Sequence, residues 1–237
     1  MAKGKNKLKD VAAAINRSQT ETSTQIRELM EHELIIKTGV FFRFHNKMFK
    51  FWLREVYEKK ELSVLCSTNT ENFLARVEEV IAEYDELCRL DVSERMLGLF
   101  RLFKNDMIEF GEKKRQLPHF TELMSVDSQE VPTENSRRLI GRGHGRCWVC
   151  KITEEKATEK EIRDLVEGPE DKKMPHTKVL LALKGLDDNA KLLAKEKRVL
   201  TLGLSRINLL MDIFGKSPII DPGLVQTPAA LPPTAQE

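Results

Sequence analysis

The stretch LIIKTGVFFRF, residues 34–44, decides which fold the first part of the chain adopts. Its two halves, Leu34 to Lys37 and Val40 to Phe44, are rich in the β-branched and aromatic residues that favour strands. Gly39 lies between them and can take the positive φ that a tight turn requires. The stretch therefore predicts a β-hairpin.

Two short amphipathic helices precede this hairpin. Apolar residues recur at the spacing of one helical face in residues 7–16 and again in residues 20–34, with a polar turn between them. Two helices, a tight turn and a hairpin are the elements of a winged helix-turn-helix. An aromatic helix follows, and we expect its Phe49 and Trp52 to be core residues. A winged helix has a further helix before this pair, and Met1 to Gly4 resemble its end, which would leave the apolar face of Leu8 and Val11 for another chain to cover.

The charge distribution assigns any phosphate contacts to this first segment, although a lysine-rich start is by itself more typical of a solvated tail. Residues 1–60 carry 13 Lys and Arg against 7 Asp and Glu, a net of +6 that leaves −4 for the other 177 residues. In helix-turn-helix proteins the N-terminal part of the second helix enters the major groove, and cations near the wing contact phosphates. The residues expected to face bases are Gln19, Thr22, Ser23 and Gln25, and those expected to contact phosphates are Lys37, Arg43 and Lys47.

Beyond residue 60 the pattern predicts core-facing helices at 70–90 and 92–103. The later strands alternate with helices, which predicts a partly parallel sheet. Strands are expected at 106–110, 120–126, 137–141, 146–153, 179–183 and 199–204, and helices at 158–167, 187–195 and 205–214. Thr158, with Glu161 three residues later, is the pattern of a capping box at the start of the first of these helices.

The expected fold class is α+β. It comprises a winged helix-turn-helix module in residues 1–60, a helical connector in 61–105 and an α/β module in 106–216. Residues 217–237 are proline-rich without periodicity, and we expect a disordered tail there.

Five stretches resemble the C-terminal half of archaeal-type ATPases. In that family a P-loop ATPase domain is followed by a winged helix and then by a module similar to the restriction-endonuclease fold. The resemblance implies this endonuclease-like fold for residues 106–216. The stretches are residues 7–35, 41–57, 117–123, 147–162 and 189–216.

Two departures from the family bear on activity. No G-x-x-x-x-G-K-[ST] segment is present, so the chain lacks the nucleotide cradle of the ATPase. Related nuclease modules carry a Glu-x-Lys pair where this chain has Lys151 and Thr153. Because carboxylates hold the Mg²⁺ of such nucleases, Lys151 puts a cation where the metal would bind. The resemblance therefore implies an inactive nuclease-like module, with no catalytic residue, metal or cofactor.

Cys147 and Cys150 have the C-x-x-C spacing of zinc and redox sites, with His144 and His176 as further candidate ligands. On a strand, residues three apart point to opposite faces, which favours two apolar core cysteines instead. The glycine-rich segment 141–146 lies between two strands, so a hairpin is favoured over a phosphate loop.

These patterns predict a non-catalytic, cytoplasmic DNA-binding protein that binds duplex DNA weakly and does not enter a membrane. The alternative is an interaction or regulatory subunit that docks on a separate ATPase chain or self-associates. A decayed fragment with no present role is a third possibility. A steep loss of affinity with salt would distinguish a DNA-binding module from a protein-docking one.

Overall fold

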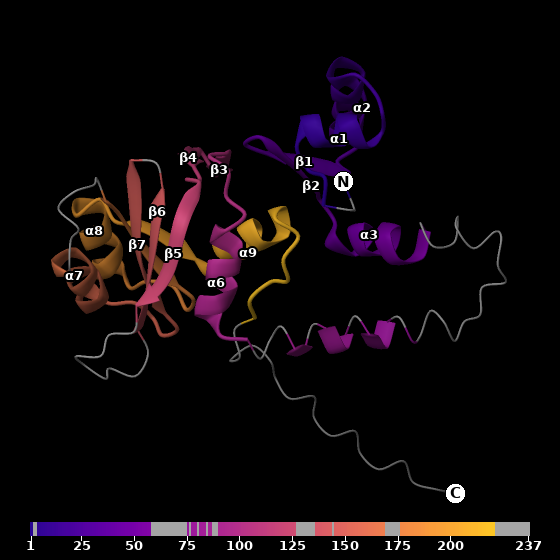
Figure 1. Ribbon diagram of the computed structural model, residues 1–237. Helices are drawn as coiled ribbons and strands as arrows, with labels where there is room; N and C mark the ends of the chain where they lie inside the picture. Colours follow the sequence, from indigo (N-terminus) through magenta and orange to yellow (C-terminus); the bar gives the residue numbers. More distant parts are fainter. Residues whose placement is uncertain are drawn as a thin grey trace, which may run out of the picture.

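The computed structural model describes residues 1, 4–57, 75, 77–79, 81–83, 85–86, 90–126, 136–143, 145–168 and 176–220. Within these residues an N-terminal unit of helices and a hairpin adjoins a five-stranded mixed sheet covered by helices on both faces (Figure 1). The expected α+β class is confirmed.

The N-terminal unit has the predicted order of helices and strands. Ser18 caps its second helix and Asn46 caps its third, through the backbone N–H groups of Glu21 and Phe49. Gly39 takes a φ of +66° at the turn between the two strands. The elements are α1 (Leu8–Ala14), α2 (Gln19–Glu31), β1 (Ile35–Thr38), β2 (Phe41–Phe44), α3 (Lys47–Trp52) and the π-helical turn η1 (Leu53–Tyr57).

The larger part of the chain builds the mixed sheet. Its strand order is β5-β6-β7-β8-β9, antiparallel as far as β7 and parallel from β7 to β9. The parallel pairs are joined through helices, as the alternation of the sequence predicted. The strands are β5 (Phe120–Val126), β6 (Ser136–Gly143), β7 (Arg146–Thr153), β8 (His176–Ala182) and β9 (Leu200–Gly203).

Four helices cover the sheet. Those on one face are α6 (Val92–Phe100) and α9 (Leu204–Ile213), and those on the other are α7 (Glu159–Glu167) and α8 (Asp188–Glu196) (Figure 1). The strand β7 shows why both faces are buried: Cys150 and Ile152 belong to the first core, whereas Val149 packs against the second. The predicted capping box of α7, between Thr158 and Glu161, is confirmed.

A small hairpin links the N-terminal unit to the sheet. It consists of β3 (Met107–Phe110) and β4 (Lys113–Gln116), of which only β3 was expected. All four residues of β4 are exposed, and they are charged or polar. A strand without an apolar face has no alternation for a sequence pattern to detect.

The hairpin β1–β2 is packed on the rest of the molecule. Its Val40 N–H donates to the carbonyl oxygen of Met107 at 3.1 Å, and a Cβ at Gly39 would collide with that same oxygen. Phe41 is 1% exposed and belongs to the main core, where its ring lies 5.5 Å from that of Phe214. The N-terminal unit therefore shares a core with the sheet instead of forming a separate body.

Three expectations about burial and order were wrong. Trp52 is 44% exposed. Its ring stacks on that of Phe49, but in the part of the chain that the structure describes this side of α3 stays open to solvent. Val11 is only 8% exposed and Leu8 packs beside it, so this face of α1 has a partner within the unit. Residues 217–220 are not a free tail: Ile219 is 4% exposed, and its N–H and C=O both bond the Asn208 amide.

The predicted helices of residues 70–103 have different outcomes. Met96, Leu99 and Phe100 are fully buried, as expected for the second helix. In the first, the residues that the structure describes from 75 to 86 are helical, yet Ile81 is 55% exposed, so the expected core face is open to solvent there. Residues 58–74 and 221–237, which include part of this stripe and most of the predicted tail, lie outside the described residues.

Candidate nucleic-acid interface

The second helix of the N-terminal unit starts at a fixed point. The Ser18 Oγ accepts from the Glu21 N–H at 3.2 Å, and the Glu21 carboxylate accepts from the Ser18 N–H at 3.1 Å and from its hydroxyl at 2.8 Å. The hydrogen bonds from the Ser18 hydroxyl and N–H lower the pKa of Glu21 below its ordinary value. This carboxylate therefore serves the helix cap.

Thr22 was wrongly predicted to face bases. It is 1% exposed, and its hydroxyl donates to the Ser18 carbonyl oxygen at 2.7 Å. With Ile26, one turn later and 4% exposed, it forms the inner face of α2. Among the other predicted base contacts, Gln19 is exposed and Ser23 and Gln25 are half-buried.

The outward face of α2 consists of residues that the sequence analysis did not select. Thr20, Thr24 and Arg27 are exposed, and so are Glu28 and Glu31 further along the same side, where their charge opposes phosphate contact. The Thr24 hydroxyl donates to the Thr20 carbonyl oxygen at 3.3 Å. Thr20, Thr24 and Arg27 lie about 100° to 160° around the helix from Thr22 and Ile26. The helical period could have identified these residues. Thr20 and Thr24 are each two residues from the buried Thr22, and Arg27 directly follows the buried Ile26, so all three point away from the buried side.

The hairpin separates two of the predicted phosphate contacts. Across β1 and β2, Lys37 faces Phe42 and Ile36 faces Arg43, so Lys37 and Arg43 project from opposite faces. Arg43 is half-buried, and its Nε donates to the Thr38 hydroxyl at 3.3 Å. Lys37 is exposed just before the packed turn.

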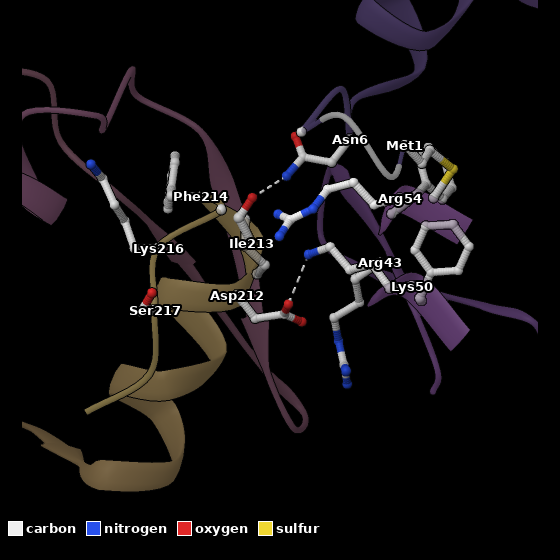
Figure 2. Close-up of a pocket in the computed structure, with 14 residues that line it drawn as sticks. Met1, Asn6, Arg43, Lys50, Arg54, Asp212, Ile213, Phe214, Lys216 and Ser217 are labelled. Atoms are coloured by element: carbon white, nitrogen blue, oxygen red, sulfur yellow. Dashed lines mark hydrogen bonds and ion pairs between the residues drawn. The ribbon is translucent and has the colours of Figure 1, made fainter. Parts of the chain in front are cut away.

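A cleft of about 480 Å³ lies where β2 and α3 meet the C-terminal end of α9 (Figure 2). Arg43, Lys50, Arg54 and Lys216 line it, against one carboxylate, that of Asp212. Lys50 donates to Asp212 at 3.0 Å, and the Asn6 amide donates to the Ile213 carbonyl oxygen at the end of α9. Cations are stabilised beside the carbonyl end of a helix, so these groups attach the N-terminal unit to α9.

A second ion pair makes a similar link. The Lys7 ammonium contacts both Asp106 carboxylate oxygens, at 2.8 and 2.7 Å. Lys7 and Lys50 were counted in the charge of the N-terminal segment, yet both are neutralised by carboxylates of the larger part of the chain. Lys47, at the start of α3, is exposed, as the predicted phosphate contact requires.

At the degenerate nuclease positions, Lys151 and Thr153 are both buried on β7. The Lys151 Nζ donates to the Asp164 carboxylate of α7 at 3.0 Å. Burial would raise the pKa of nearby Glu161, but hydrogen bonds from Thr158 and the charge of Lys151 bring it below its ordinary value. Both carboxylates thus already have partners.

Cys147 and Cys150 are buried, as the core interpretation predicted. Burial raises the pKa of the Cys150 thiol, which keeps it protonated. His176 lies opposite Cys147 on the neighbouring strand, whereas His144 is outside the described residues. Among the residues that the structure describes, no three His, Cys, Asp or Glu side chains gather as metal ligands would.

Comparison with known proteins gives few matches. No family model and no curated protein matches the chain. The solved structure of EndoMS in its apo form is similar over 35% of this chain, with 19% sequence identity and a TM-score of 0.27. The chain spans 38% of the length of that protein. Among the described helices, none has both the length and the apolar character needed to cross a membrane.

Proposed function

We propose that the chain binds duplex DNA without catalysis, through a winged helix-turn-helix whose α2 enters the major groove. The outward face of α2 carries this proposal. Thr20, Thr24 and Arg27 supply hydroxyl and guanidinium donors on one exposed face, and Gln19 stands at the helix start. Such groups contact base edges and phosphates, whereas a face used only for packing would be apolar.

The wing of this proposed module differs from a free one. Because its turn is packed against Met107, the turn itself cannot contact DNA, and the phosphate contacts other than that of Arg27 fall to Lys37 and Lys47. Two of the ten Lys and Arg described in residues 4–57 are already paired with Asp106 and Asp212. Fewer free cations release fewer counterions, so weak binding is expected.

The expected dissociation constant for a random duplex lies in the nonspecific range, roughly 10⁻⁴ to 10⁻⁶ M at physiological salt. Replacing Arg27 by glutamine should weaken binding and lower the slope of log affinity against log salt by about 1, because one phosphate contact is lost. Fluorescence anisotropy over a salt series measures both quantities.

The matched control is Arg163→Gln on α7, which removes an exposed arginine from the far part of the molecule. It should leave affinity and slope unchanged. Equal losses for the two variants would show that net charge, not the α2 face, governs binding. No anisotropy change at protein concentrations up to about ten times the weak end of that range would contradict DNA as the ligand.

The non-catalytic part of the proposal rests on the Lys151–Asp164 pair. Restoring the motif with Lys151→Glu and Thr153→Lys should not by itself create a nuclease. The new carboxylate would stand at a 3% exposed position beside Asp164, where a proton shared by the two carboxylates competes with the metal, and Glu161 is held by its cap. Supercoiled plasmid incubated with Mg²⁺ or Mn²⁺ tests wild type and double variant together. Nicking by the wild type that a chelator abolishes would make the module an enzyme.

A further inference from the structure

The N-terminal unit has an uncovered apolar groove. Its volume is about 360 Å³, more than twice the roughly 150 Å³ cavity that a benzene molecule fills. None of its lining side chains is charged. The side chains that matter most to its floor and walls are Ile15, Leu29, Leu34, Phe44, Phe49 and Leu53.

This groove leaves the unit with a thin core. Only four apolar residues, Val11, Ile26, Ile35 and Phe42, form its separate buried cluster. Ile15, which lines the groove, is 45% exposed. Contiguous apolar surface around a small core is typical of a site that another element covers.

The same chain carries an apolar helix face without a partner. From residue 75 to 86 the described residues are helical, with Val77 and Ile81 one turn apart and Ile81 55% exposed. The sequence stripe continues on both sides. Its other members are Phe73, Leu74, Val80, Tyr84, Leu87 and Cys88.

The charges of the two segments differ in sign. Residues 70–90 hold six acidic and two basic side chains, a net of −4. The described residues 4–57 hold ten Lys and Arg against six Asp and Glu, and two of these cations are already paired with Asp106 and Asp212, which leaves a net of +2. Both signs occur beside the groove itself: Arg17 is two residues from Ile15, and Glu28 directly precedes Leu29. The net charge of the unit therefore favours an acidic helix over a basic one.

We propose that the helix of residues 75–86 docks its Val77–Ile81 stripe into this groove within the same molecule. This is the helix-in-groove mode, in which anchors at i and i+4 fill an apolar cleft. The proposal concerns the N-terminal unit alone and stands whether or not α2 binds DNA.

The tether favours docking within one molecule. Tyr57, whose ring lies 5.5 Å from Trp52, ends the unit, and 18 residues later the helix has begun at Ala75. A chain of that length reaches up to about 60 Å when extended. A partner on the same chain is also present at an effective concentration that dilution does not lower, unlike a second copy.

Cross-linking tests the proposal in the full chain. With Cys66 and Cys88 replaced by serine, the pair Leu29→Cys and Ile81→Cys should form an intramolecular disulfide at least about tenfold faster than Leu29→Cys with Glu83→Cys, because residue 83 lies about 200° around the helix from residue 81. Cys147 and Cys150 are buried and are retained. Intact mass and gel filtration distinguish a monomeric from a dimeric product.

Equal rates for the two pairs, or a disulfide confined to dimers, would overturn intramolecular docking and leave the groove to another chain. A second measurement does not depend on the cysteine variants. Ile81→Glu should raise the fluorescence of a dye that binds apolar surface several-fold, while Glu83→Gln should not. No difference between these two variants, with folding checked by circular dichroism, would also contradict the proposal.

Discussion

Replacing Phe41 by alanine should lower the free energy of unfolding of the whole protein by about 3–5 kcal/mol, the usual effect of truncating a buried aromatic residue. Phe41 is 1% exposed and packs against Phe214 in the main core, although it belongs to the hairpin of the N-terminal unit. The loss should therefore reach the sheet. Urea unfolding followed by far-ultraviolet circular dichroism and by tryptophan fluorescence measures it.

Making the substitution in a Trp52→Phe variant restricts the tryptophan fluorescence to the core of the sheet. The chain has two tryptophans, so Trp148, which is 6% exposed in the sheet core, becomes the reporter. In this background, Phe41→Ala should shift the Trp148 transition as far as the circular dichroism transition. An unchanged Trp148 midpoint would show that the N-terminal unit unfolds by itself.

The matched control is Trp52→Ala. Trp52 is larger than Phe41 and lies in the same unit, but it is 44% exposed. Its truncation should cost less than about 1 kcal/mol, since little buried apolar area is lost. A loss as large as that of Phe41→Ala would mean that Trp52 is covered in solution, as docking of the helix of residues 75–86 would allow.

The second large effect is expected at the ion pair between β7 and α7. Asp164→Ala leaves the Lys151 ammonium, whose side chain is 3% exposed, without its carboxylate. Removing one partner of a fully buried pair costs about 3–5 kcal/mol. Asp164 is 42% exposed, so water screens part of this interaction, and we expect about 2–3 kcal/mol. The melting temperature should fall by about 4–12 °C.

The reverse substitution should be mild. Lys151→Met removes the buried charge and keeps a similar volume, while Asp164 is left with water around it. Replacement of a buried ion by a packed apolar side chain is often neutral or stabilising. A melting temperature that falls equally for Lys151→Met and Asp164→Ala would show that the pair itself, not the stranded cation, determines the stability.

Local sequence signals determined most of the secondary structure. The β-branched and aromatic residues of 34–44 and the glycine at the turn specified the β1–β2 hairpin, because both act over a few neighbouring residues. The capping box at Thr158 placed the start of α7 for the same reason. The alternation of strands and helices after residue 146 indicated the parallel pairs β7–β8 and β8–β9.

The candidate interface could be predicted only in part. The sequence indicated the helix that carries it, but it assigned Thr22 outward, and in the structure this residue bonds the Ser18 carbonyl oxygen on the inner face. Thr22 stands one turn before Ile26 of the apolar stripe, so the helical period places it on the inner side. Only packing decides how much of that stripe is covered, and in the structure Leu29 and Leu34 of the same stripe stay exposed.

Contacts between distant segments were decided by the tertiary structure alone. Nothing near Lys7 or Lys50 in sequence distinguishes them from the exposed Lys47, yet each is paired with a carboxylate 99 or 162 residues away. Phe41 likewise has no feature in the sequence that distinguishes it from Phe42 or Phe44, and its contact with Phe214 forms only in the folded chain. The sequence by itself determined most of the helices, the β1–β2 hairpin and most of the strand positions along the chain, because those depend on near neighbours. Which cations face solvent, and which apolar face is left open, was decided by the folded chain, because charge pairing and burial depend on groups that only folding brings together.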